Sequence, residues 1–295
     1  MKKGKDVIAF NIIAFAVVGF VGLACILPFL MLLVGSFQSE SSILTHGYSL
    51  IPRTLDWGAY SFIFREPDKI IHSYLVTIFL TVAGTSISIF FSSMTAYVLA
   101  RKDVKYRNGM AFYLFFTTLF SGGLVPYYLL MSNYLELRNT MSILLLNGMF
   151  NVLYILILRT YIANSIPDSI SESAKIDGAN DFAIFIRVVF PLLKPALASI
   201  GLFVALGYWN DWYTATLFIT KENLFPLQYS LYRILSSTTF AKQMLQNNGA
   251  VSAIELPEQT VKLALTVVAT GPIVFAYPFV QKYFVAGLTI GSVKG

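Results

Sequence analysis

The stretch "YWNDWY", which begins at Tyr208, places an amide and a carboxylate among aromatic side chains in an otherwise apolar segment. Aromatic rings cover the apolar C–H faces of a sugar ring, while amide and carboxylate groups form hydrogen bonds with its hydroxyl groups. An ionisable side chain within a membrane is unfavourable enough to indicate a function. The stretch therefore indicates a polar path for a sugar, lined by Tyr208, Trp209, Asn210, Asp211 and Trp212.

A structural role is the alternative for these polar residues. Asp211 could lie near the outer membrane interface, with Trp209 and Trp212 in the aromatic belt that anchors helices there. Asn147 and Asn151 lie one helical turn apart in another apolar segment. They could line the same path, or they could form hydrogen bonds between helices, which is the commoner use of such amides.

A second group of polar residues forms a compact element between two apolar segments, from residue 164 to residue 195. Pro167 ends the preceding apolar segment. Ser169 and Glu172 have the spacing of a capping box, and Gly178 is typical of a helix end. The pattern predicts a short helix over Ser169–Asp177.

A second helix is expected directly after the turn at Gly178. Asn180 or Asp181 can cap the sequence "FAIFIRVVF", whose apolar side chains can lie along the membrane surface until Pro191 ends the helix. A plain connector between two membrane spans is the alternative. A capped, compact element has more structure than an exposed connector needs.

These polar residues must be positioned by membrane helices. Of the 295 residues, 56% are hydrophobic and only 12% are charged, which favours a membrane protein over a soluble globular domain. A transmembrane helix needs about 20 mostly apolar residues. Six segments meet that requirement: Val7–Phe37, Ile71–Ala100, Met110–Met131, Met141–Ile162, Ala196–Ile219 and Val261–Tyr283. The sequence predicts an all-α membrane protein with six transmembrane helices, which form a single domain over residues 1–295.

The distribution of basic residues predicts the orientation of these helices. If the N-terminus is cytoplasmic, the inside segments hold most of the lysine and arginine residues, as the positive-inside rule expects. Both termini and the 164–195 element then lie in the cytoplasm. The net charge of +6 is explained in this way without a nucleic-acid partner. The first apolar run continues to Gly35 and is too long for a cleavable signal peptide, so it is read as an uncleaved first helix.

Several classes of chemistry are not supported by the sequence. Cys25 is the single cysteine, which excludes an internal disulfide, and no cysteine–histidine cluster predicts a metal site. No G-x-x-x-x-G-K-[ST] phosphate loop occurs, so ATP binding by this chain is not expected. His46 and His72 fall outside or at the edge of a span, and no serine–histidine–acid set is present. The chain is not expected to be an enzyme or to hold a cofactor.

The 164–195 element resembles the cytoplasmic signature of bacterial ABC importer permeases, which reads Glu-Ala-Ala, then Gly, then Ile-x-Leu-Pro. The matching residues are Glu172-Ser173-Ala174, Gly178 and Val188-Val189-Phe190-Pro191. Ser173, Val188 and Phe190 depart from the signature by size-tolerant changes. "GYWNDWYTATLFI" and "QKYFVAGLTIGSVKG" are similar to the carbohydrate-importing branch of this family. The chain most resembles the smaller permease of the oligosaccharide systems related to the maltose transporter.

This resemblance implies a type I importer architecture in the bacterial cytoplasmic (inner) membrane. It implies five kinds of partner: a second homologous permease subunit, two ATPase subunits that bind ATP and Mg, an extracytoplasmic solute-binding protein, an oligosaccharide substrate and membrane lipid. The outer segments Gln38–Lys69 and Thr220–Thr260 would contact the binding protein, and ordinary solvated loops are the alternative for both.

The same resemblance assigns a mechanical role to the predicted Ser169–Asp177 helix. In such importers this helix docks in a cleft of the ATPase and couples its closure to movement of the membrane helices. The ATPase-coupling residues would be Glu172 as the charged anchor, Ala174 as the point of close approach and Gly178 as the turn, together with Ser173 and Pro191. Alternatives are a secondary transporter driven by an ion gradient, for which no matching inverted halves are found, and a structural membrane scaffold.

Overall fold

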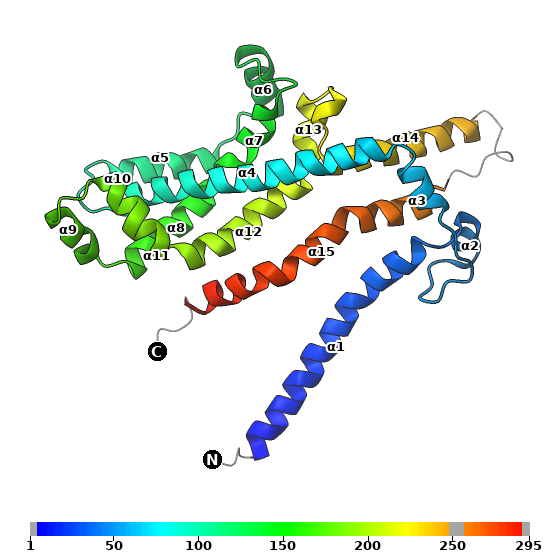
Figure 1. Cartoon of the computed structure of the whole chain (residues 1–295), viewed down its shortest axis with the longest axis horizontal. Coiled ribbons are helices and arrows are strands. Elements are labelled where there is room, and N and C mark those ends of the chain that lie inside the picture. Colours follow the sequence, from blue (N-terminus) through cyan, green and yellow to red (C-terminus); the bar gives the residue numbers. More distant parts are fainter. Residues whose placement is uncertain (1–4, 248–256, 291–295) are drawn as a thin grey trace. The chain divides into compact units, whose positions relative to one another are not determined.

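A computed structural model of the chain describes residues 5–247 and 257–290, and the regular structure in these two ranges is helical (Figure 1). The chain divides into two compact units. One comprises the chain up to Pro67 together with Leu231–Ile273, and the other comprises Asp68–Ser230 and the chain from Val274 onwards. Lys2 and Lys3, the last three residues of "QNNGA", the first two of "ELPEQ" and the end of "QKYFVAGLTIGSVKG" lie outside the described residues.

The first unit is built from the N-terminal helices and from parts of the last two helices. Its elements are α1 (Lys5–Gly35), α2 (Glu40–His46), α3 (Gly58–Ile63), most of α14 (Leu227–Asn247) and the first half of α15 (Glu258–Ile290). The most apolar window of α1 has none of its residues buried against the rest of the chain. A helix that exposes apolar side chains on every side suits hydrocarbon rather than water.

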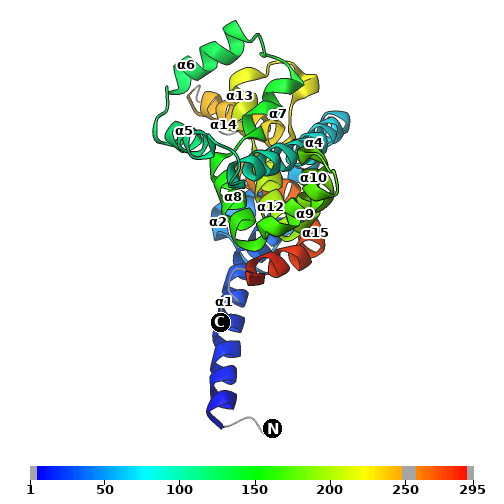
Figure 2. The ribbon, with the colours of Figure 1, turned by 90° about the vertical axis from the view of Figure 1, so that its left-hand side faces the viewer.

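The second unit holds the remaining elements. They are α4 (Pro67–Ala100), α5 (Arg107–Leu119), α6 (Leu124–Leu129), α7 (Met141–Met149), α8 (Val152–Ser165), α9 (Asp168–Ile176), α10 (Asp181–Ile184), α11 (Phe190–Leu192), α12 (Lys194–Asn210) and α13 (Tyr213–Phe218). Short π-helical turns follow α6 at Leu130–Tyr134 and α10 at Phe185–Val189, and a 3₁₀ turn spans Glu222–Leu224. In Figures 1 and 2, α6, α7 and α13 lie together, away from α9 and α10.

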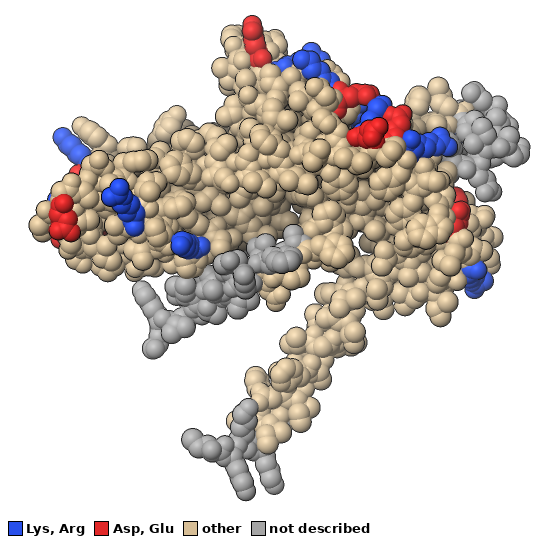
Figure 3. Space-filling view, in the orientation of Figure 1, with Lys and Arg blue, Asp and Glu red and all other residues tan. Residues whose placement is uncertain are grey.

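The long helix α4 shows the packing expected of a membrane helix. It buries small and polar side chains, among them Thr77, Ser88 and Ser92, whereas Leu75 and Val82 are exposed. Figure 3 shows no charged side chain on the visible surface along the middle of α4. Small residues let membrane helices approach closely, while lipid accommodates the large apolar ones. α4 also buries large side chains, among them Leu80, Tyr97 and Leu99, so small and large residues share its buried face.

The core of the second unit includes a tight contact around the ring of Tyr208 in α12. A side chain at Gly84 in α4 would place its Cβ 2.4 Å from Cζ of this ring, and one at Gly148 in α7 would place it 2.7 Å away. The hydroxyl of Tyr208 donates a hydrogen bond to the carbonyl oxygen of Leu145 at 2.6 Å. Two glycines therefore allow α4 and α7 to close around one aromatic side chain.

Three of the predicted spans are not single straight helices. The segment Met110–Met131 is divided between α5 and α6, with a bend of 113° between Arg107–Leu119 and Leu124–Tyr134. The segment Met141–Ile162 is divided between α7 and α8, which differ in direction by 46°. Gly123, with φ of +88°, lies in the first break, where a residue with a side chain would be strained.

The predicted fifth span, Ala196–Ile219, also has a break, because α12 ends at Asn210 and α13 begins at Tyr213. A bend of 81° further separates α12 from the preceding helical stretch, Asp181–Leu192. Hydropathy averages over such breaks because the residues around them remain apolar. Non-helical backbone at membrane depth is tolerated where protein or a water-lined cavity surrounds it.

Within the described residues, two helices, α1 and α4, are each long and apolar enough to cross a membrane. The three bent pairs also meet this test if each pair is counted as one span. The predicted sixth span, Val261–Tyr283, lies within the continuous helix α15. The helical, membrane-type fold is therefore confirmed, while the number of six spans and the orientation of the termini stay predictions.

Candidate functional site

The predicted Ser169–Asp177 helix is present as α9, but its N-terminal cap differs from the prediction. The helix begins at Asp168, with Pro167 as the residue before it, so the capping box of Ser169 and Glu172 was wrong. Pro167 has an extended backbone (φ −62°, ψ 140°), which starts the helix one residue earlier and places Asp168 in its first turn. A carboxylate there is favoured by the positive end of the helix dipole.

The C-terminal end of α9 is a Schellman turn centred on Gly178. The N–H of Ala179 donates to the carbonyl of Ala174 at 3.0 Å, and the N–H of Gly178 donates to the carbonyl of Lys175 at 3.0 Å. Gly178 has φ of +80°, the left-handed conformation that favours glycine. The turn predicted at this position is confirmed, and it fixes where α9 stops.

The two faces of α9 differ in their exposure. Glu172 and Ser173 are exposed, and Ile176 is 86% exposed although it is apolar. Glu172 forms no ion pair within the described part of the chain. Ala174, on the other face, packs against the core of the second unit. The helix thus presents a carboxylate and an apolar side chain on its outer face.

The cap of the helical stretch after Gly178 was predicted correctly, but the environment of its apolar side chains was not. Oδ1 of Asn180 accepts a hydrogen bond from the N–H of Ala183 at 2.8 Å, so Asn180 caps α10. The predicted position along the membrane surface is wrong, because Ile184, Phe185 and Val189 are fully buried in the core. These residues anchor the loop in the second unit.

Pro191 does not end this stretch, because α11 continues to Leu192 and the bend follows at Leu193. A proline ring inside a helix collides with the carbonyl of the residue four positions earlier. The wider π-helical turn at Phe185–Val189 includes that position, Arg187, and this turn accommodates Pro191 without a break.

Four charged residues form what we call the Arg101 cluster, and sequence analysis missed it. Its members are Arg101 and Asp103 in the turn after α4, Lys175 in α9 and Asp181 in α10. Nη1 of Arg101 lies 2.7 Å from Oδ1 of Asp181, and Nζ of Lys175 lies 3.0 Å from Oδ2 of Asp103. Arg101 also forms a two-pronged pair with Asp103, in which Nε donates to Oδ1 at 2.8 Å.

These contacts shift the pKa values of the Arg101 cluster. Hydrogen bonds from Arg101 and then Lys175 hold the pKa of Asp103 well below the ordinary carboxyl range, and Asp103 raises the pKa of Arg101. Because the pKa of Asp103 is lowered by folding, its contribution to stability is present above the ordinary carboxyl pKa of about 4. That contribution is lost as the pH falls through the lowered value.

A polar cluster at the helix breaks, here called the Asp211 cluster, contains Asp211, Thr214, Asn147 and Tyr127. Oδ1 of Asp211 accepts a hydrogen bond from the N–H of Thr214 at 3.0 Å, which satisfies the first turn of α13. Nδ2 of Asn147 donates to Oγ1 of Thr214 at 2.6 Å, and the hydroxyl of Tyr127 donates to Oδ1 of Asn147 at 2.9 Å. Three bent segments thus meet through one hydrogen-bonded chain.

The residues predicted to line a path are placed in different environments. Tyr208 and Trp209 are buried, whereas Asn210 and Trp212 are exposed and Asp211 is half-buried. Asn210 accepts a hydrogen bond from Nε2 of Gln228 at 3.4 Å. The ring of Tyr208 lies against Gly84 and Gly148, and its hydroxyl donates to the carbonyl of Leu145. These contacts place Tyr208 in the protein core.

Asn147 and Asn151 do not lie one turn apart on a single helix, because the break between α7 and α8 separates them. Asn147 belongs to the Asp211 cluster. Asn151 is the N-cap of α8 and accepts a hydrogen bond from the N–H of Leu153 at 3.0 Å. The sequence does not show that Tyr127, Thr214 and Gln228 form hydrogen bonds with the predicted path residues. The spacing of Asp211 and Thr214, which is that of a helix cap, is the signal that could have indicated one of these contacts.

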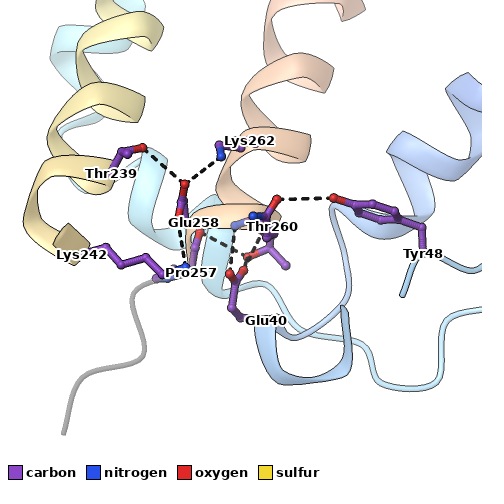
Figure 4. Close-up of polar contacts among 9 residues, drawn as sticks. Glu40, Tyr48, Thr239, Lys242, Pro257, Glu258, Thr260 and Lys262 are labelled. Atoms are coloured by element: carbon purple, nitrogen blue, oxygen red, sulfur yellow. Dashed lines mark hydrogen bonds and ion pairs between the residues drawn. The ribbon is translucent and has the colours of Figure 1, made fainter. Parts of the chain in front are cut away.

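A third polar group lies in the first unit, at the start of α15 (Figure 4). The buried carboxylate of Glu40 accepts hydrogen bonds from the N–H groups of Gln259 and Thr260, both at 2.9 Å, and from Oγ1 of Thr260 at 3.1 Å. Nearby, Lys262 and then Lys242 lower the pKa of Glu258 through hydrogen bonds. These contacts fasten α2 and α14 to the N-terminus of α15.

Comparison with known proteins gives a consistent assignment. Residues 85–290 match the model of the family described as "Binding-protein-dependent transport system inner membrane component". The chain is 41% identical over 273 residues to the polygalacturonan/rhamnogalacturonan transport system permease protein of Bacillus subtilis (strain 168), covering 92% of this chain and 94% of that protein. Protein LplC of the same organism is 38% identical, covering 97% of this chain and 95% of that protein.

A solved structure agrees with the sequence comparisons. The chain is similar to a chain in the crystal structure of a bacterial ABC transporter involved in the import of the acidic polysaccharide alginate, with a TM-score of 0.77 and 30% identity. The similarity covers 96% of this chain and 99% of that one. Because the family model matches most of the chain and the relatives match nearly all of it, the chain belongs to the inner membrane components of binding-protein-dependent transport systems.

Proposed function

We propose that this chain is a permease subunit of a binding-protein-dependent ABC importer for oligosaccharides, and that its substrate is an acidic glycan fragment. The observation that carries the proposal is the match to sugar-system permeases along almost the whole chain. The relative at 41% identity is named for polygalacturonan and rhamnogalacturonan, and the solved relative imports alginate. Both names describe acidic glycans, which favours uronic-acid units in the substrate of this chain.

The partners follow from this function. The importer would contain a second homologous permease, two ATPase subunits that bind ATP and Mg, and an extracytoplasmic solute-binding protein. This chain would form one transmembrane domain over residues 1–295, with six spans and both ends in the cytoplasm of a bacterial cell. It would hold no ATPase site and no metal of its own. Membership of the family does not favour a secondary transporter driven by an ion gradient.

The geometry of α9 supports its role as the coupling helix. Its outer face carries Glu172, Ser173 and Ile176, and its Schellman turn at Gly178 gives it a fixed end. In our proposal Glu172 forms an ion pair with the ATPase and Ser173 lies at the same contact. Ala174 packs against the core of the second unit, and Pro191 lies in α11, which leads into α12, so that movement of the ATPase displaces the membrane helices.

The Asp211 cluster supports a polar path for the sugar. Its carboxylate, amide, threonine hydroxyl and phenol hydroxyl can exchange hydrogen bonds with sugar hydroxyls, and the ring of Trp212 can cover an apolar sugar face. In this proposal Asn210, Asp211, Trp212 and Asn147 contact the sugar. Tyr208, Trp209 and Asn151 shape the path through the packing and cap described above.

Uptake into vesicles tests the proposed function directly. The complete importer is reconstituted with ATP inside the vesicles and binding protein outside, and labelled oligogalacturonides are supplied. Uptake is expected to require both ATP and the binding protein, and to persist when a protonophore collapses the proton gradient. Maltotriose and arabino-oligosaccharides are the neutral comparison. ATP-driven uptake of the neutral sugars alone would contradict the acidic substrate, and uptake without ATP would contradict the importer class.

Two substitutions at Asp211 separate its contact with sugar from its support of α13. Asp211→Asn keeps an acceptor for the N–H of Thr214 but removes the charge, and Asp211→Ala removes both. We expect the asparagine variant to assemble and unfold like the wild type while uptake falls about tenfold, the effect of losing a charge-assisted hydrogen bond that a sugar hydroxyl donates to the carboxylate. The alanine variant should also lose about 1 kcal/mol of stability. Full uptake by Asp211→Asn would reduce Asp211 to a helix cap.

A further inference from the structure

The way in which α9 is attached determines which membrane helix it can move. None of its side chains is fully buried, so packing alone fastens it weakly. Its firmest side-chain contacts with the rest of the second unit are ionic. Lys175 pairs with Asp103 of the Arg101 cluster, and Asp168 pairs with Lys102 at 2.6 Å. Both partners lie in the turn that directly follows α4.

The two ionic attachments differ in their burial. Lys102 and Asp168 have side chains that are 75% and 54% exposed, and exposed pairs of this kind contribute little. The side chain of Arg101 is only 16% exposed. Its planar guanidinium pairs with Asp103 through two nitrogens and also contacts Asp181. Lysine cannot reproduce the two-pronged pair, although Nζ of Lys175 contacts the same two carboxylates at 3.0 and 3.8 Å. Because Asp103, Lys175 and Asp181 have side chains that are 51%, 44% and 57% exposed, the Arg101 cluster is the stronger attachment through Arg101 itself.

Arg101 also continues into the core through aromatic rings. Its guanidinium carbon lies 5.6 Å from the ring centre of Tyr97, one turn earlier in α4. The ring of Tyr97 stacks on Phe185, with ring centres 5.7 Å apart. Phe185 begins the π-helical turn after α10. Both the ionic and the aromatic contacts of Arg101 thus join the end of α4 to the loop that contains α9 and α10.

We propose that Arg101 is a positioning residue that transmits the displacement of α9 to the end of α4. This inference rests on the proposed function, because it presumes that an ATPase moves α9. Arg101 touches neither sugar nor nucleotide. By holding Asp103 and Asp181 together, it makes the turn after α4, α9 and α10 move as one body. Without it, α9 can shift against α4, and ATP hydrolysis is no longer converted into import.

The test measures how many ATP molecules are hydrolysed for each oligogalacturonide imported by reconstituted complexes. Arg101→Gln should assemble with the ATPase and hydrolyse ATP, yet use about tenfold more ATP for each sugar, within the usual range of coupling between sites. Arg101→Lys should recover part of this loss. Lys102→Gln removes the same charge from the adjacent, exposed position and should stay within about twofold of the wild type.

A double-variant cycle makes the test specific to the pair with Asp181. If the two residues act together, Asp181→Asn should also raise the ATP used for each sugar, and adding it to Arg101→Gln should raise it little further. Wild-type coupling in Arg101→Gln, equal effects of Arg101→Gln and Lys102→Gln, or additive effects in the double variant would overturn the proposal. Failure of both Arg101→Gln and Asp181→Asn to assemble would also overturn it, because the cluster would then act only in folding.

The wild-type complex distinguishes this proposal from the proposed function. If the wild type shows no ATP-dependent uptake of any oligosaccharide, the importer function fails. If the wild type imports sugar and Arg101→Gln does so at the same ATP cost, only the role of Arg101 fails.

Discussion

Replacing Gly84 with alanine is expected to destabilise the protein by about 1–3 kcal/mol, the usual range for overpacking a core. The added Cβ would lie 2.4 Å from the ring of Tyr208. The ring cannot turn away freely, because Gly148 lies against it and its hydroxyl donates to the carbonyl of Leu145. α4 would have to move away from α12. Thermal unfolding of the purified complex in lipid nanodiscs measures the loss.

Two further variants make this prediction specific. Gly207, which is also in α12, has no atom near the position of an added Cβ, so Gly207→Ala should be neutral or slightly stabilising. Combining Gly84→Ala with Tyr208→Val removes the ring and should recover part of the stability lost in Gly84→Ala. Equal effects of Gly84→Ala and Gly207→Ala would show that the close approach is not a constraint.

Removal of the Glu40 carboxylate should have an effect of similar size in the first unit. In Glu40→Ala, two N–H groups in the first turn of α15 and the hydroxyl of Thr260 lose their acceptor. Each hydrogen bond to a charged group contributes about 1.5–3 kcal/mol, and the contributions are not additive. We expect a loss of about 3 kcal/mol, measured by the same unfolding assay.

The neutral variant Glu40→Gln should fall between the wild type and Glu40→Ala, because only one of its two terminal atoms accepts hydrogen bonds. Leu44→Ala is the matched control on α2, since the side chain of Leu44 is exposed. If Glu40→Ala and Leu44→Ala unfold at the same temperature, the contact with α15 does not stabilise the protein.

Local signals in the sequence predicted the parts of the fold that depend on neighbouring residues. Gly178 indicated the end of α9 because a left-handed turn is a property of the residue itself, and Asn180 indicated the cap of α10. The cap at Ser169 was wrong because Pro167 starts the helix earlier. Pro167 and Ser169 both indicated the start of a helix, and the spacing of Ser169 and Glu172 did not show which of the two begins it.

Contacts between distant residues were not predictable in this way. Glu40 and Thr260 are separated by 220 positions, and Lys175 and Asp103 by 72. Neither pair leaves a periodic signal, because ion pairs and caps depend on where helices end in space. The break at Asp211 was missed for a related reason. Hydropathy records that a segment is apolar, but it does not record the direction of the backbone.

The small buried side chains of α4 have a consequence for which substitutions the chain can accept. In a water-soluble helix, polarity separates tolerated from harmful changes on the buried side. At Ser88 and Ser92 of α4 the separation is by volume, because both small side chains are almost fully buried. Serine, alanine and glycine should interchange at these two positions with little loss, whereas leucine should be excluded. Thr77 should differ, because its hydroxyl accepts a buried hydrogen bond from the N–H of Leu227 at 2.7 Å and its removal leaves that donor unpaired.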